Sequence, residues 1–240
     1  MEKNRRASEA DIQQRYYADT AHRYNDMHVR RDDEHYFALS LLVAAIEHFG
    51  FQSVLDLGSG TGRAPLFIKE RNPNITVRGI EPVKELREIG YSVGLSQAEL
   101  IEGDAADVDA NDSDFDIVCE FGVLHHVRHP HVVVSEMLRV AKRAVFISDS
   151  NNFGEGAFAK RTVKQLLNAL GLWKVADFVK TGGKGYRISE GDGLSYSYSV
   201  FNDYKRIKNR CKSVHILNTT GGGINPYRNA SHVALLGIKQ

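Results

Sequence analysis

Cysteine is scarce in this sequence, with only Cys119 and Cys211 among 240 residues. The two thiols have neither the short spacing of a metal-binding pair nor the number that a disulfide framework needs. A cysteine-based metal site and a disulfide-stapled fold are therefore both disfavoured. Few, unpaired thiols are typical of proteins in a reducing compartment, so we expect a cytoplasmic protein with both thiols buried.

Long hydrophobic runs are absent as well. The segment Met1 to Ala10 is polar and charged, unlike the apolar core of a secretion signal. No stretch reaches the roughly 20 apolar residues that span a bilayer. We therefore expect neither secretion nor a membrane partner. The chain also lacks internal repeats, low-complexity tracts and heptads, which leaves its oligomeric state open.

The chain as a whole lacks a large excess of positive or negative charge, because its formal net charge is +1. The total conceals an asymmetry. Residues 1–150 hold 17 Lys and Arg against 25 Asp and Glu, whereas residues 151–240 hold 14 against 5. A basic C-terminal part favours an anionic ligand that approaches from that side. The alternative is a solvated basic face that binds nothing.

The most informative stretch is Val54 to Gly62, a short apolar run that breaks into three alternating glycines. This pattern predicts a buried parallel strand that ends in a tight turn before a helix. Glycine tolerates positive φ in such a turn and lets a ligand approach the backbone. We therefore expect a nucleotide-sized notch at the carboxyl end of the strand, within one α/β domain.

Two features of this stretch separate two classes of cofactor. A dinucleotide fingerprint requires a third glycine where this sequence has Arg63. The carboxylate of Asp56 would repel a diphosphate but suits a ligand with an ammonium or sulfonium charge. Glu81, at the end of the next predicted strand, is placed to accept hydrogen bonds from ribose hydroxyls, which both classes contain. The pattern favours a positively charged nucleoside.

The motif from Val54 to Gly62 resembles the first motif of the class I S-adenosylmethionine-dependent methyltransferases, in their small-molecule branch of types 11 and 12. The resemblance covers residues 10–149 and 213–238 well, and residues 150–212 hardly at all. It implies S-adenosyl-L-methionine as cofactor, S-adenosyl-L-homocysteine as product, and a methyltransferase activity of class EC 2.1.1.-.

The resemblance also implies a Rossmann-like, doubly wound α/β fold with a seven-stranded sheet. The last two expected strands, 214–217 and 232–238, have no helix between them. We therefore expect the antiparallel terminal hairpin that dinucleotide-binding folds generally lack. The expected organisation is one domain over residues 1–240, with N-terminal helices (1–50), a cofactor-binding core (51–149), an inserted helical and hairpin cap (150–212) and the terminal hairpin (213–240).

By position, the resemblance assigns Asp104 and the backbone of Ala105 to the adenine ring, and Glu120 to the methionine end of the cofactor. An aromatic side chain of the N-terminal helix is expected beside the cofactor, with Tyr16 or Tyr24 as the candidate. We expect no metal. The complete expected cofactor-binding set is Tyr16, Asp56, Gly58, Ser59, Gly60, Gly62, Glu81, Pro82, Asp104, Ala105, Glu120 and Phe121.

The run after the fourth predicted strand supplies candidates for the chemistry. Imidazole titrates nearest to neutral pH, so His125 and His126 are candidate general bases, together with Asp149 at the end of the fifth predicted strand. His129 is a further candidate. The alternative is that one histidine of the pair only anchors the chain to the core.

Residues 150–212 depart from the common pattern of the class. We expect two helices and then a hairpin from Tyr186 to Val200, with Tyr196 and Tyr198 on one face. Such a face is a candidate lid or acceptor wall, because tyrosine rings stack on sugars or bases. The alternative is a hairpin that only packs on the inserted helices.

We therefore expect an enzyme that transfers a methyl group to a hydroxyl or amine of a small acceptor, with sugar-containing and anionic acceptors as options. A nucleic acid partner is disfavoured, because the basic residues are scattered and no nucleic-acid module is recognisable. One alternative is a non-catalytic partner protein with the methyltransferase fold. Another is an NAD(P)-dependent oxidoreductase, against which Arg63 and the terminal hairpin argue.

Overall fold

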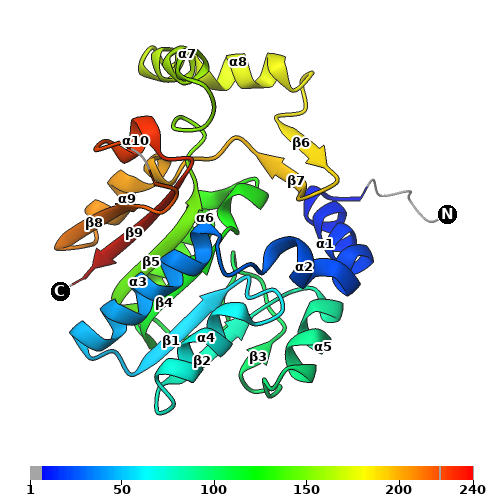
Figure 1. Ribbon diagram of the computed structural model, residues 1–240, viewed down its shortest axis with the longest axis vertical. Helices are drawn as coiled ribbons and strands as arrows, with labels where there is room; N and C mark the ends of the chain where they lie inside the picture. The colour runs from blue at the N-terminus through cyan, green and yellow to red at the C-terminus, as the bar shows by residue number, and fades with distance from the viewer. Residues whose placement is uncertain (1–6, 222, 240) are drawn as a thin grey trace.

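A computed structural model describes residues 7–221 and 223–239 and is built around a seven-stranded sheet (Figure 1). The strand order is β3-β2-β1-β4-β5-β9-β8, with β1 to β5 parallel and β9 antiparallel to both of its neighbours. The doubly wound fold with an antiparallel terminal pair of strands is confirmed. The expectation that no helix separates these two strands is wrong, because the short helix Pro226–Asn229 lies between them. The strands are β1 (Ser53–Leu57), β2 (Thr76–Ile80), β3 (Leu100–Ile101), β4 (Phe115–Phe121), β5 (Ala141–Ser150), β8 (Ser213–Asn218) and β9 (His232–Ile238).

Helices cover both faces of this sheet, with α3 and α4 on one face and α6 on the other. None of the helices in the described ranges is long and apolar enough to cross a bilayer. The helices are α1 (Glu9–Thr20), α2 (Tyr24–His28), α3 (Glu34–Phe49), α4 (Arg63–Arg71), α5 (Lys84–Ser92), α6 (Pro130–Val140), α7 (Phe158–Ala169), α8 (Trp173–Lys180), α9 (Tyr204–Lys208) and α10 (Pro226–Asn229).

Strand β1 does not alternate between buried and exposed residues, because both faces of the sheet are covered there. Val54 packs with α3 and α4, whereas Leu55 and Leu57 pack in the cluster that contains α6. The register pairs Leu57 with Ile80 of β2 and with Glu120 of β4. The carboxyl ends of these three parallel strands therefore meet at one edge, where open α/β sheets bind their ligands.

The N-terminal segment starts with a capped helix and then bends. The Ser8 hydroxyl accepts a hydrogen bond from the Asp11 amide, and the Asp11 carboxylate accepts one from the Ser8 amide, which forms a capping box. Helix α1 ends at Thr20, and a short 3₁₀ turn precedes α2. The bend lets Tyr17 of α1 and Tyr24 of α2 pack edge to face, with 5.6 Å between ring centroids.

The inserted region contains α7, α8 and a separate two-stranded hairpin of β6 (Tyr186–Ser189) and β7 (Gly193–Tyr196). Strand β7 ends at Tyr196, so the expectation of a hairpin strand up to Val200 is wrong. Tyr198 and Val200 are buried in the main core, where the Tyr198 hydroxyl donates to Asp203. The hairpin packs on α1 rather than on α7 and α8 (Figure 1).

Candidate active site

The glycine turn after β1 has the backbone that its sequence predicts. Gly58, Gly60 and Gly62 have φ values of 70°, 54° and 85°, a region that L-residues with a side chain rarely adopt. A Cβ atom on Gly58 would lie 2.4 Å from Val123 Cγ2, and one on Gly60 would lie 2.5 Å from Tyr24 Oη. Glycine is thus required here both for the turn and for close packing beneath the N-terminal helices.

Three buried carboxylates surround this turn at the ends of β1, β2 and β4. Asp56 accepts a hydrogen bond from the Ser59 hydroxyl at 2.7 Å, and Glu81 accepts one from the Gly60 amide at 2.8 Å. One oxygen of Glu120 accepts from the Val123 amide, while the other is buried without a hydrogen-bond partner. None of the three forms an ion pair with a Lys or Arg within the described ranges.

Burial without a cationic partner makes these groups hard to ionise. It raises the pKa of Asp56 to about 7 and that of Glu81 to about 7. Burial, together with the nearby negative charge of Asp149, also raises the pKa of Glu120 well above its usual range. Asp56 and Glu81, which lie in cavity walls without a cationic partner, fit a cationic ligand such as S-adenosylmethionine and oppose a diphosphate.

Two cavities with shared lining residues lie along this edge. The larger has a volume of about 540 Å³, and the deeper one about 110 Å³. Tyr17, Tyr24, Gly58 and Phe121 line both of them. Of the predicted cofactor residues, the larger cavity is lined by Gly58, Glu81, Pro82, Asp104, Ala105 and Phe121, and the deeper one by Asp56, Gly58, Ser59 and Phe121.

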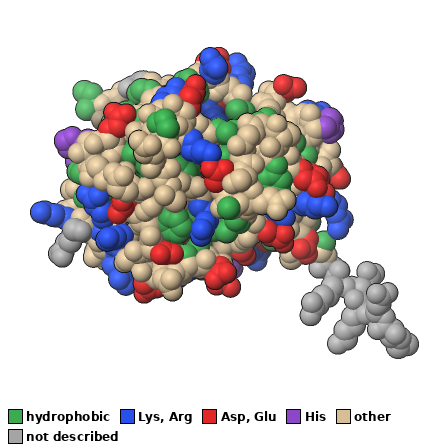
Figure 2. Space-filling model, turned by 90° about the horizontal axis from the view of Figure 1, so that it is seen from below, with side chains coloured by type: hydrophobic (Ala, Val, Ile, Leu, Met, Phe, Trp, Pro, Cys, Tyr) green, Lys and Arg blue, Asp and Glu red, His purple; other side chains and the backbone are tan. Residues whose placement is uncertain are grey.

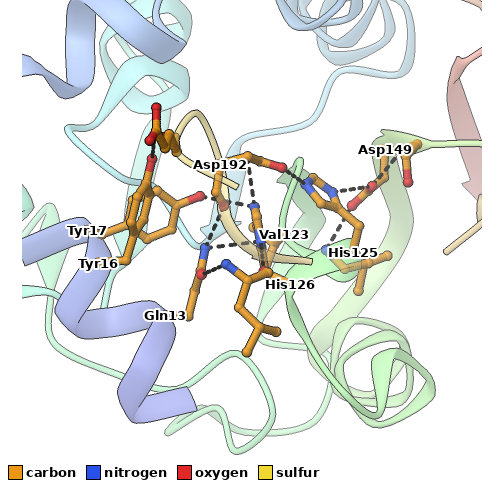
Figure 3. Close-up of polar contacts among 12 residues, drawn as sticks. Gln13, Tyr16, Tyr17, Val123, His125, His126, Asp149 and Asp192 are labelled. Atoms are coloured by element: carbon orange, nitrogen blue, oxygen red, sulfur yellow. Dashed lines mark hydrogen bonds and ion pairs between the residues drawn. The ribbon is translucent and has the colours of Figure 1, made fainter. Parts of the chain in front are cut away.

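Four predicted cofactor residues line neither cavity: Tyr16, Gly60, Gly62 and Glu120. The glycines shape the turn, whereas Tyr16 faces the hairpin: its hydroxyl donates to Glu190 O at 2.7 Å, and its ring lies against Gly193 (Figure 3). The sequence could not show which of Tyr16, Tyr17 and Tyr24 faces the cleft. That depends on how α1 packs and on the bend after it, and the structure places Tyr17 and Tyr24 there.

Cofactor binding should tighten as the pH rises through the pKa values of Asp56 and Glu81. Both groups are raised to about 7, so they are mostly protonated at pH 5.5 and mostly ionised at pH 7.5, and only the ionised forms attract a cation. We expect the dissociation constant of S-adenosylmethionine to be about tenfold higher at pH 5.5 than at pH 7.5. Titration calorimetry would measure it, and Asp56→Asn should flatten the dependence. Equal affinity at both pH values would contradict this account.

His125 is held between two carboxylates from distant parts of the chain (Figure 3). Its Nδ1 lies 2.7 Å from Asp149 Oδ1, and its Nε2 lies 3.4 Å from Asp192 Oδ2. Although burial alone would lower the pKa of His125, the two carboxylates outweigh it and raise this pKa well above 6.5. The same contacts hold the pKa values of Asp149 and Asp192 well below their usual range.

His126 has a different environment and anchors the hairpin. Its Nδ1 donates to Leu194 O at 2.6 Å, since a carbonyl only accepts, and its Nε2 lies 3.0 Å from the Tyr17 hydroxyl. Gln13 completes the anchor by accepting a hydrogen bond from the Leu194 amide at 2.5 Å and donating to Asp192 O at 3.2 Å (Figure 3). These contacts support the alternative in which one histidine of the pair serves packing.

Asp192 is the site residue that sequence reasoning missed. It lies in a Gly-Asp-Gly turn, which predicts a hairpin tip and nothing more, and it is 67 residues away from His125. In the fold, Asp192 and His125 line the deep cavity and also a separate polar cavity of about 250 Å³ beside the cap. Further residues lining this polar cavity are Asn152, Tyr186, Arg187, Tyr196 and Tyr198. His129 lines only the larger cofactor-side cavity.

The sheet order, the antiparallel β9, the glycine turn and the acidic cleft together define a class I S-adenosylmethionine-dependent methyltransferase. Residues 55–147 match the family described as "Methyltransferase domain". The protein is thus an S-adenosylmethionine-dependent methyltransferase. Among curated protein sequences, none matches the chain.

Solved structures with this fold cover nearly the whole chain. One is magnesium protoporphyrin IX methyltransferase of Synechocystis PCC 6803 with bound S-adenosylhomocysteine: 14% identity, TM-score 0.63, and 97% of this chain and 100% of that chain covered. Another is a methyltransferase of Thermotoga maritima described as a possible histamine N-methyltransferase: 18% identity, TM-score 0.58, and 94% and 99% covered. At these identities the similarity shows the fold and leaves the acceptor open.

Proposed function

We propose that this enzyme methylates a hydroxyl or amine of a small polar acceptor bound in the cavity beside the cap. The observation that carries the proposal is that His125 and Asp192 line both this cavity and the deep end of the cofactor cleft. A methyl donor and an acceptor placed in the two cavities would therefore meet at these side chains. In-line alignment of two reactants is the main contribution a protein can make to such a transfer.

The residues of the cleft suit the cofactor part by part. We propose that Glu81 accepts hydrogen bonds from the ribose hydroxyls, because a carboxylate has acceptor capacity beyond the two backbone amides it already binds. Asp104 and the Ala105 amide would bind adenine, and Asp56 would face the cationic end. When bound, S-adenosylmethionine supplies an activated methyl group, so the chain itself needs to provide alignment and a route for one proton.

The proton of an acceptor hydroxyl has a path through His125. Neutral His125 can accept it at Nε2, while Asp149 holds Nδ1–H and stabilises the imidazolium that results. Because the pKa of His125 is raised, the neutral form is the minor one at neutral pH. The rate of methyl transfer to a hydroxyl should therefore rise with pH above neutrality.

Replacement of His125 should separate catalysis from cofactor binding. We expect His125→Ala to lower kcat by about 10²–10⁴-fold and to remove the alkaline rise of the rate, with little change in the dissociation constant of S-adenosylmethionine. The neighbouring variant His126→Ala is the matched comparison: it should loosen the hairpin and move Asp192 away from His125, which shifts the rise to lower pH without removing it. Initial rates across the pH range and calorimetry would decide. A His125→Ala enzyme with an unchanged pH profile would contradict the assignment.

A polar acceptor with hydroxyl groups suits the cavity best. Tyrosine, serine and asparagine side chains line it, so a sugar-containing compound finds hydrogen-bond partners there. Its charged lining is mixed, with Arg187 beside the acidic residues Glu155, Asp177 and Asp192. The similar structures are named for a histamine and a porphyrin acceptor, which differ widely, so the fold does not select the acceptor. A screen of sugars, nucleotide-linked sugars and amines with labelled S-adenosylmethionine tests the proposal. Turnover of none of them, despite cofactor binding, would favour the non-catalytic alternative.

A further inference from the structure

Helix α7 presents its polar side chains to the protein, which is the reverse of an ordinary surface helix. The amide of Gln165 donates to Phe153 O at 2.9 Å, and the amide of Asn168 donates to the Tyr227 hydroxyl at 3.0 Å. The ammonium group of Lys164 also points inward and donates to the Asn152 carbonyl. A helix of a globular protein normally buries its apolar stripe, so here the apolar stripe is left on the outside.

The outer side of α7 and α8 is a concentrated apolar surface, which we call the arm face. Of the fourteen large hydrophobic side chains exposed in the described ranges, nine lie between residues 158 and 188. In α7, Val163 and Leu166 are three residues apart, and in α8, Val175 precedes Phe178 and Val179 by three and four residues, so each set lies along one side of its helix. Eight of the nine form the arm face, on the two helices and the turn that joins them, and the ninth, Ile188, lies on β6. Those of the arm face are Phe158, Val163, Leu166, Leu170, Leu172, Val175, Phe178 and Val179, with Phe158 76% and Val179 73% exposed.

Positive charge accompanies this apolar surface. Between residues 158 and 188 the sequence has seven Lys and Arg and a single acidic residue, Asp177, which is buried. Lys160, Lys174 and Lys180 are all exposed. An apolar face with Phe and Leu, bordered by lysines, is typical of helices that lie in the interface of an anionic bilayer.

The placement of the arm suits contact with an extended surface. Figure 1 shows α7 and α8 end to end at one extremity of the molecule, beyond the main sheet. Figure 2 looks at the opposite end, where hydrophobic side chains lie singly among charges of both signs. The apolar and basic surface of α7 and α8 is thus not repeated at the opposite end of the molecule.

We propose that the arm face docks on an anionic lipid bilayer, with its apolar side chains in the interface and its lysines at the headgroups. The absence of a long hydrophobic run led to the expectation of no membrane partner, but a helix that lies in the interface needs no spanning segment. The polar cavity that α8 and the hairpin line would then open near the membrane surface. Docking itself does not depend on the acceptor or on the role of His125.

Sedimentation with vesicles tests the proposal on the full chain. The wild-type protein should bind phosphatidylglycerol-rich vesicles and bind pure phosphatidylcholine vesicles more weakly. We expect Leu166→Ser/Phe178→Ser to lower the partition coefficient about tenfold or more, since two side chains leave the apolar face. The matched control is Phe37→Ser/Val93→Ser, which removes two comparably exposed side chains outside the arm and should bind as wild type does. Circular dichroism and S-adenosylmethionine binding establish that each variant is folded.

Three results would overturn the proposal. Wild-type protein that stays in the supernatant with anionic vesicles would do so, as would an equal loss of binding in the control variant. The third is a wild-type dimer that Leu166→Ser/Phe178→Ser converts to a monomer, with no vesicle binding by either form. That outcome would assign the arm face to contact between two copies of the chain.

Discussion

Replacement of Asp149 by alanine should lower the free energy of unfolding by about 3–5 kcal/mol and abolish methyl transfer. Asp149 is fully buried, and its carboxylate accepts hydrogen bonds from the Leu124 amide at 2.8 Å and from His125 Nδ1 at 2.7 Å. Alanine would leave a buried backbone amide without a partner and a buried imidazolium without its closer carboxylate. Urea denaturation and a methyl-transfer assay would measure the two effects.

Two further variants at acidic positions make this result interpretable. Asp149→Asn keeps an acceptor for the Leu124 amide, so it should cost less stability than alanine, yet it cannot stabilise a protonated His125 and should still lose turnover. Asp109→Ala removes an exposed acid, and its stability should stay within about 0.5 kcal/mol of wild type. An Asp149→Ala protein as stable as Asp109→Ala would show that the buried pair does not support the fold.

The variant Gly58→Val should raise the dissociation constant of S-adenosylmethionine by about 100-fold, equal to about 2.7 kcal/mol. The backbone at this position has φ +70°, and a Cβ would lie 2.4 Å from Val123 Cγ2. Gly58 lines both parts of the cofactor cleft, so the turn or Val123 would have to move into the space that the ligand uses. Calorimetry with S-adenosylmethionine and S-adenosylhomocysteine would measure the loss.

Gly50 offers a matched control for backbone strain. It has φ +63° at the end of α3, and a Cβ there meets nothing within 4 Å. Gly50→Val should therefore lose stability through the left-handed backbone, by about 1–2 kcal/mol, without a change in cofactor affinity. Equal losses of affinity in the two variants would mean that strain in the chain, rather than the shape of the cleft, weakens binding.

The sequence could place the cofactor side of the candidate site at one edge of the sheet, because its residues are consecutive or follow successive strands; their contacts with the cofactor stay a prediction. Asp56 and Glu81 lie at the ends of neighbouring parallel strands, and parallel neighbours bring their carboxyl ends to one edge. The acceptor half could not be predicted in the same way. Asp192 reaches His125 only because Gln13 and His126 fasten the hairpin to α1, through contacts between segments more than 60 residues apart.

The two adjacent histidines show the limit of local reasoning. Imidazole chemistry made His125 and His126 equal candidates, since residue type and spacing are the same for both. Both rings lie 3.4 Å from Asp192, but only His125 also contacts Asp149, whereas His126 contacts a backbone carbonyl and a tyrosine hydroxyl. A pKa depends on burial and on charges nearby in space, which spacing along the chain does not reveal.

The sequence by itself determined the strands, the glycine turn and the acids at the strand ends, because hydrophobic period, glycine spacing and residue positions are local properties. Its resemblance to the class I methyltransferases implied the seven-stranded sheet and the cofactor. Only the tertiary structure decided which tyrosines face the cleft, which histidine joins a carboxylate pair, and that α7 turns its apolar side outward. Each of these depends on the direction in which a segment packs against distant parts of the chain, and packing directions are set by the sum of many long-range contacts.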